Sequence, residues 1–182
     1  MNDFSMVCRV LGTLFYRSPQ DEILAPLMTL IMDGKLTEHW PLDQDDLLAR
    51  LGKGVTPTAL AKDYSALFDG AAAKVQPFRS SWLAAPESDV RAFLSESGMP
   101  LAETPADHFG TLLLAASWLE DHAQQDETIA QIRLFDEFLM PWSDIFLGKV
   151  EANAGSDFYR VLAMITREAL QALREELAEA SA

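Results

Sequence analysis

The chain has 182 residues, of which 49% are hydrophobic, and its 14 Lys and Arg face 28 Asp and Glu, a formal net charge of −14. This length and apolar content support a buried core and exclude a disordered chain. The acidic charge excludes nucleic acid and anionic membranes as partners, because both need a basic surface on the protein. Two explanations of the charge remain: attraction of a basic peptide partner, or solubility alone.

The N-terminal half carries apolar residues at helical spacing. The spacing predicts a first helix over about 4–15, a second over 23–31, a third over 42–51 and a fourth that begins at 56 or 58 and ends before Gly70. Cys8, the single cysteine, lies on the apolar face of the first helix and is expected to be buried. A disulfide within the chain and a thiolate metal site are therefore excluded.

The middle of the chain is less regular. Residues 71–86 contain Pro77 and Pro86 and show no alternation of apolar and polar residues, so we expect a structured loop with aromatic anchors. A helix is predicted over about 88–96, followed by a break at 98–100.

The C-terminal half predicts three long helical segments: one after Pro105, one or two abutting helices over 127–153 with a kink at Pro141, and one over about 156–180. With no convincing strand, we expect one all-α globular domain of about eight helices over residues 1–182. No run of 18 apolar residues and no basic signal segment is present, which predicts a cytoplasmic protein without membrane insertion.

The stretch Thr104-Pro105-Ala106-Asp107-His108 precedes the most hydrophobic helix. Thr104 fits an N-cap, Pro105 the first helical position and Asp107 the third, where a carboxylate meets the positive end of the helix dipole. Capping does not account for His108, so recognition and catalysis stay open as its role. Adjacent residues on a helix diverge by about 100°, so we do not expect Asp107 to orient His108.

No other pattern assembles a metal or catalytic site. His108 and His122 are about 21 Å apart along one helix and cannot share an ion, and Gly52-Lys53-Gly54 is not a phosphate-binding loop. We expect no metal, no cofactor and no catalytic residue. The alternative is a small helical hydrolase with His108 as general base and Glu103 or His122 as a third group.

Aromatic residues near helix ends suggest recognition. Tyr64, Phe78, Trp82 and His108 are not required by helical packing, and aromatic anchors beside acidic side chains suit a peptide with apolar and arginine residues. Core packing is the alternative explanation. It is preferred for Phe68 and open for Trp82.

Five segments together resemble one family, the redox-enzyme maturation chaperones of the TorD/DmsD/NarJ type, and within it the YcdY-like branch. Each segment is weak by itself, but they follow one another in the family's order from about residue 9 to residue 160. They are residues 9–16 followed by Pro19, residues 63–68 followed by Gly70, residues 77–82, residues 105–108, and residues 138–142 with Phe146, Phe158 and Tyr159.

The resemblance implies an all-helical cytoplasmic chaperone with no catalysis of its own. It would bind a twin-arginine signal peptide or another segment of a metal-cofactor enzyme, molybdenum-dependent or dependent on another metal, until the cofactor is inserted. A plain interaction subunit is the remaining alternative, and the client and the oligomeric state stay open. The positions that match the family's peptide-binding residues are Arg9, Tyr16, Tyr64, Leu67, Phe68, Pro77, Phe78, Trp82, Pro105, Asp107 and His108.

Overall fold

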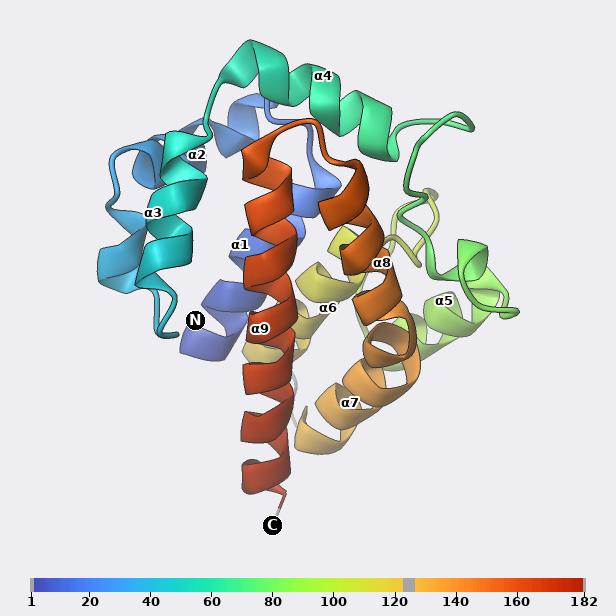
Figure 1. The fold of residues 1–182 in the computed structure, drawn as a ribbon. Helices are drawn as coiled ribbons and strands as arrows, with labels where there is room; N and C mark the ends of the chain where they lie inside the picture. Colours follow the sequence, from blue (N-terminus) through green and yellow to red (C-terminus); the bar gives the residue numbers. More distant parts are fainter. Residues whose placement is uncertain (1, 123–126, 182) are drawn as a thin grey trace.

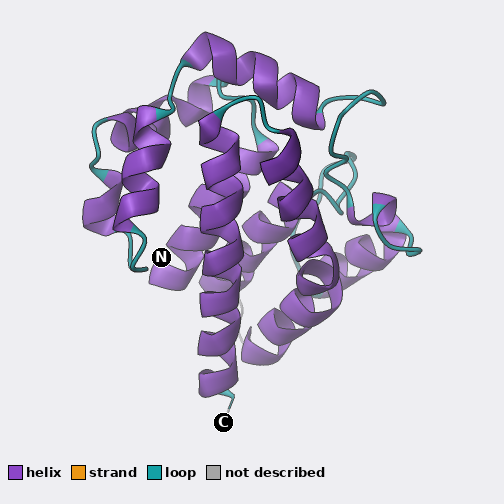
Figure 2. Ribbon diagram, in the orientation of Figure 1, coloured by secondary structure: helices purple, strands orange, loops and turns teal. Residues whose placement is uncertain are grey.

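The computed structural model describes residues 2–122 and 127–181, and every regular element in these ranges is a helix (Figure 1, Figure 2). The α-helices are α1 Asp3–Tyr16, α2 Ala25–Met32, α3 Asp45–Lys53, α4 Pro57–Phe68, α5 Glu87–Glu96, α6 Phe109–His122, α7 Glu127–Arg133, α8 Met140–Asn153 and α9 Asp157–Ala180. The prediction of an all-helical fold is confirmed, and Cys8 is buried as expected. In the described part of the chain, none of the helices has the length and apolar content that crossing a bilayer requires.

Helices α1 and α6 pack closely against each other, and two glycines allow their approach. A Cβ atom on Gly110 of α6 would lie 2.7 Å from the carbonyl oxygen of Gly12 on α1. Since real Cβ atoms do not come this close to backbone, only glycine fits at this crossing. The rings of Phe15 and Phe109 meet edge to face beside it, with centroids 5.0 Å apart.

The longest helix, α9, stands between α3 and α8, and α4 lies across their upper ends (Figure 1). Ser156 caps α9 by accepting a hydrogen bond from the amide of Tyr159. Asp63 of α4 accepts hydrogen bonds from the amides of Gly155 and Ser156, both at 2.9 Å. This carboxylate therefore fixes α4 to the turn between α8 and α9.

The predicted kink near Pro141 is present as a π-helical segment, Leu134–Leu139, between α7 and α8. Pro141 has no amide hydrogen and cannot bond to the carbonyl one turn earlier, so regular α-helical bonding cannot run through this point. Pro141 lies instead in the first turn of α8, where a missing amide hydrogen costs nothing.

Two loops lie side by side at one end of α6. One joins α4 to α5 and contains Phe78, and the other joins α5 to α6 and contains His108; these two residues form an isolated antiparallel bridge. The amide of Phe109 donates to the carbonyl of Pro77 at 2.8 Å, and the amide of Arg79 donates to the carbonyl of Asp107 at 3.0 Å. The bridge brings two segments together that the sequence separates by about thirty residues.

Candidate functional site

The start of α6 differs from the prediction. The helix begins at Phe109, not at Pro105, and residues 103–108 form bends, a turn and the bridge to Phe78. Thr104 is therefore not the N-cap, and Asp107 does not occupy the third position of the helix. The expectation that Asp107 and His108 are adjacent on a helix is wrong for the same reason, because Asp107 lies in a turn and His108 forms the bridge to Phe78.

His108 supplies the cap. Its Nδ1 accepts the amide hydrogen of Gly110 at 3.0 Å, and its carbonyl accepts that of Leu112, which opens the helical bonding of α6. An accepting Nδ1 carries no proton, so this hydrogen bond assigns the neutral ring with its proton on Nε2. Burial lowers the pKa of His108 to about 4, against the opposing effect of the adjacent Asp107.

The imidazole of His108 also lies between two aromatic rings. Tyr16, at the end of α1, meets it edge to face with centroids 5.3 Å apart, and Phe78 does so from the other loop at 5.4 Å. The same side chain thus begins α6 and joins α1 to the loop that precedes α5. The sequence left His108 unexplained, and the structure gives it this architectural role.

Asp107 is almost fully buried, at 1% exposure, and one of its two carboxylate oxygens has no partner. Oδ2 accepts the amide hydrogen of Ser80 at 2.8 Å, which ties the turn after Phe78 to the α5–α6 loop. Oδ1 has no hydrogen-bond partner in the described part of the chain. A buried oxygen of a charged group without a donor is costly, so it favours the binding of a donor from outside.

Two hollows flank Phe78 and Pro105, which line both of them. The first, which we call the aromatic pocket, has a volume of about 320 Å³. Its lining consists of Tyr16, Tyr64, Phe68, Asp69, Gly70, Pro77, Phe78, Thr104, Pro105 and His108. The hydroxyl of Tyr64 donates to the carbonyl of Phe15 at 2.8 Å, which orients this part of the wall.

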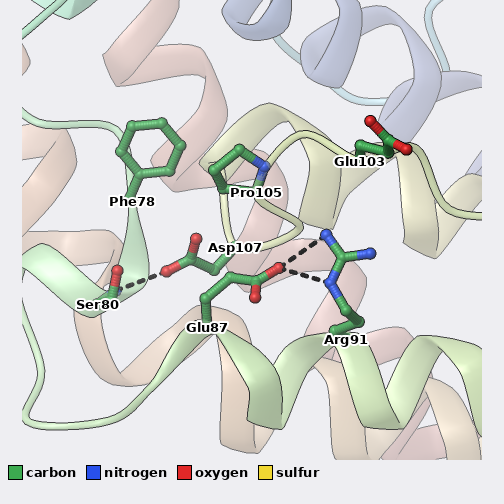
Figure 3. A pocket seen from close by; sticks show the side chains of 7 residues that line it. All are labelled: Phe78, Ser80, Glu87, Arg91, Glu103, Pro105 and Asp107. Atoms are coloured by element: carbon green, nitrogen blue, oxygen red, sulfur yellow. Dashed lines mark hydrogen bonds and ion pairs between the residues drawn. The ribbon is translucent and has the colours of Figure 1, made fainter.

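The second hollow, which we call the acidic pocket, has a volume of about 440 Å³. Its lining consists of Phe78, Ser80, Glu87, Arg91, Glu103, Pro105 and Asp107 (Figure 3). Three carboxylates and one guanidinium give it a formal charge of −2. In Figure 3 Arg91 is bonded to Glu87 while Asp107 is bonded to Ser80, so the guanidinium does not neutralise Asp107.

The structure brings eight of the eleven sequence-derived positions to these two pockets. Asp107 lines the acidic pocket, and the aromatic pocket is lined by Tyr16, Tyr64, Phe68, Pro77, Phe78, Pro105 and His108, of which Phe78 and Pro105 are shared.

The other three positions lie outside both linings. Arg9 is an exposed residue of α1 whose guanidinium lies 3.6 Å from Asp121, near the far end of α6. Leu67 has no exposed surface and belongs to the core. Trp82 donates from its indole to the carbonyl of Gln76 at 2.7 Å and packs on the core.

The peptide-binding positions that the sequence suggested omit four polar residues of the acidic pocket: Ser80, Glu87, Arg91 and Glu103. Of these, Ser80 lay in one of the five family segments and Glu103 was named only for the hydrolase alternative. Glu87 and Arg91 are spaced i,i+4 at the start of a helix, a pattern that predicts an ordinary surface ion pair. Their contacts to the α5–α6 loop depend on how that loop folds back on α5. No local sequence signal carries that information.

The hydrolase alternative gains no support from the site. The Nδ1 atom of His108 is occupied by the Gly110 amide, and in the described residues no side chain is hydrogen-bonded to its Nε2. His122 stacks on Trp118 at the opposite end of α6, with ring centroids 4.8 Å apart. Over residues 2–122 and 127–181, no group of three or more His, Cys, Asp or Glu is arranged to hold a metal ion.

Residues 34–148 match the family model described as nitrate reductase delta subunit. The chaperone protein YcdY of Escherichia coli K12 is 58% identical over 182 residues, which cover all of this chain and 99% of the relative. A Haemophilus influenzae protein is 38% identical over 186 residues, 98% of this chain and 97% of the relative. The Tat proofreading chaperone DmsD of Salmonella typhi is 32% identical over 189 residues, 97% of this chain and 91% of the relative.

These matches confirm the resemblance that the five ordered segments indicated. The family is one of chaperones, and YcdY and DmsD are both chaperones. This agrees with the prediction of a chaperone rather than an enzyme.

Proposed function

The chain belongs to the nitrate reductase delta subunit family, and from this premise we propose that it is a chaperone which binds a leader peptide, or another segment, of a redox enzyme that requires a metal cofactor. The bound segment would lie across the wall formed by Phe78 and Pro105. The chaperone would hold the client while the cofactor is inserted. Binding would be the whole of its activity, without a catalytic step.

One observation carries this proposal: Asp107 lines a pocket of formal charge −2, and its buried Oδ1 has no donor among residues 2–122 and 127–181. A guanidinium offers five donors in a planar fork, and its hydrogen bonds to a carboxylate are charge-assisted. An arginine of the client in the acidic pocket would satisfy Asp107 and reduce the excess of negative charge. This pocket therefore suits the arginines of a twin-arginine leader.

The aromatic pocket suits the apolar part of the same segment. Its walls are rings that contact one another, so a leucine or phenylalanine side chain would bury apolar surface there without disturbing the core. Because a flexible peptide loses conformational freedom when it docks, we expect a dissociation constant on the order of micromolar rather than nanomolar.

The test compares two synthetic peptides by calorimetry. The arginine peptide has two adjacent arginines before a run of leucine and alanine, and the glutamine peptide replaces both arginines. We expect the arginine peptide to bind more tightly, with an affinity that weakens as salt is added. Equal affinities for the two peptides, or binding that salt does not change, would contradict the assignment of the acidic pocket.

We further propose that the protein acts in the cytoplasm, as one domain over residues 1–182, and that its client carries a molybdenum cofactor. Co-purification of the tagged chaperone with its client, followed by metal analysis of the client, tests this assignment. If the client contains another metal, the proposed chaperone role stands and only the class of the client enzyme changes. Recovery of the chaperone without any metalloenzyme would favour a plain interaction subunit.

A further inference from the structure

We propose that Glu87 and Arg91 of α5 are positioning residues of the binding site: they clamp the α5–α6 loop so that the Asp107 carboxylate stays available to a ligand. This inference rests on the proposed function for its ligand and on the structure for the clamp. Neither residue belongs to the segments on which the family resemblance was based. Both line the acidic pocket (Figure 3).

The clamp consists of hydrogen bonds to alternate residues of the loop. Arg91 donates from Nη1 to the carbonyl of Ala102 at 3.2 Å and from Nη2 to the carbonyl of Thr104 at 2.8 Å. The amide of Ala106 donates to Oε1 of Glu87 at 2.9 Å. Arg91 Nε also donates to this oxygen, at 3.0 Å, so one carboxylate oxygen joins the two halves of the clamp.

This alternation determines which side chains face the ligand. The backbone groups of 102, 104 and 106 bond to α5, and the side chains of the intervening residues Glu103, Pro105 and Asp107 line the acidic pocket. Each residue of the second set lies next to a residue that is bonded to α5, so holding the backbone at 102, 104 and 106 also limits where Glu103, Pro105 and Asp107 can lie. If the loop were released from α5, the side chains of Glu103, Pro105 and Asp107 would no longer be held in the lining of the acidic pocket.

The clamp also controls the charge of the pocket. Arg91 is the cation of the lining, and its guanidinium is engaged by two carbonyls and by Glu87. An Arg91 side chain free to move could reach the unpartnered oxygen of Asp107 and compete with an incoming arginine. Holding Arg91 on the loop therefore preserves the negative charge that the ligand meets.

Two pairs of variants test the clamp. Arg91→Lys retains a cation beside Glu87, but a single ammonium cannot reach three oxygens as a guanidinium does. Its control is Arg174→Lys, because Arg174 forms a comparable ion pair with Asp136, and neither residue lines a pocket described above. Glu87→Ala removes the acceptor of the Ala106 amide, whereas Glu87→Gln retains an oxygen at the same place.

The first measurement needs no ligand: amide hydrogen exchange at Ala106, followed by NMR. We expect exchange to be about tenfold faster in Glu87→Ala and Arg91→Lys, and close to wild type in Glu87→Gln and Arg174→Lys. Unchanged exchange in Glu87→Ala would overturn the clamp, whatever the protein binds.

The second measurement is the ratio of the dissociation constants for the glutamine and arginine peptides. A general loss of folded protein weakens both affinities alike, whereas a misplaced Asp107 lowers the ratio itself. We expect the ratio to fall about tenfold in Glu87→Ala and Arg91→Lys and to stay within about twofold in Arg174→Lys. Glu87→Gln keeps the acceptor but removes one negative charge of the pocket, so we expect its ratio to lie between those of Glu87→Ala and the wild type. Faster exchange with an unchanged ratio would overturn the positioning role. If the wild-type protein binds neither peptide, the proposed function fails, and the exchange experiment still decides the clamp.

Discussion

Gly12 of α1 and Gly110 of α6 cross so closely that a Cβ atom on Gly12 would lie 2.9 Å from the carbonyl oxygen of Gly110. Tyr16 follows Gly12 by one helical turn, and His108 lies directly before the first turn of α6. The crossing therefore sets the distance between the two rings that form one wall of the aromatic pocket. The separation of two helices thereby determines the shape of the site.

Gly110→Ala is expected to destabilise the protein by about 2–3 kcal/mol and to lower its melting temperature by several degrees. The added methyl group would lie 2.7 Å from the oxygen of Gly12 and 2.8 Å from the backbone nitrogen of Tyr16, so the helices must move apart. Thermal unfolding measures the loss, and peptide calorimetry measures the effect on the aromatic pocket.

The control for this variant is Gly148→Ala in α8. A Cβ there would meet only the guanidinium end of Arg167, at 3.5 Å, so the helical preference of alanine should leave stability unchanged or raise it by up to about 1 kcal/mol. Equal effects of the two substitutions would contradict the role assigned to the glycine crossing.

Asp107→Asn is expected to weaken binding of the arginine peptide about tenfold or more, with little change in melting temperature. An asparagine oxygen still accepts the Ser80 amide hydrogen at the position of Oδ2. The unpartnered oxygen, however, becomes an amide group that donates and no longer attracts a guanidinium. Calorimetry and thermal unfolding of the same sample separate the two effects.

Asp121→Asn serves as the matched control for Asp107→Asn, because Asp121 is an acidic residue near the far end of α6 that pairs with Arg9. We expect it to leave both peptide affinities within about twofold of the wild type. If it weakens binding as much as Asp107→Asn, the overall negative charge and not the acidic pocket attracts the peptide.

The sequence predicted the helices better than it predicted the site, and the reason is physical. Helical periodicity and the proline at 141 are local signals, and they gave the all-helical fold and the interruption before α8. The start of α6 at Phe109 instead depends on the bridge between Phe78 and His108, a contact between residues far apart in the chain. The bridge replaces the helix start that the capping pattern at Thr104 predicted. The contacts of Glu87 and Arg91 with the α5–α6 loop also depend on how distant parts of the chain fold together, so local sequence patterns did not predict them.

Leu67→Ala separates a core residue from a binding residue among the positions that the resemblance suggested. Leu67 has no exposed surface, so its truncation should leave a cavity and cost about 2–4 kcal/mol of unfolding free energy. At a temperature where the variant is fully folded, we expect affinity for the arginine peptide within about threefold of the wild type. A selective loss of binding without a loss of stability would assign Leu67 to the site instead.

His108→Asn is expected to flatten the dependence of stability on acid pH. The pKa of His108 is lowered to about 4 in the folded protein, mainly by burial, while an unfolded histidine has a pKa of about 6.5. Between these values the unfolded chain binds more protons than the folded one. The stabilising effect is therefore complete above about pH 6.5 and is lost as the pH falls toward 4.

Asparagine is the informative replacement because it is a preferred N-cap residue and can accept the Gly110 amide hydrogen without titrating. Between pH 7 and pH 4.5 the wild type should lose about 2 kcal/mol more than His108→Asn, which corresponds to about 5 °C in melting temperature. Carboxylates with lowered pKa, such as Glu87, titrate alike in both proteins and cancel in the comparison. Identical pH profiles would mean that the His108 ring is not held neutral by its place between Tyr16 and Phe78.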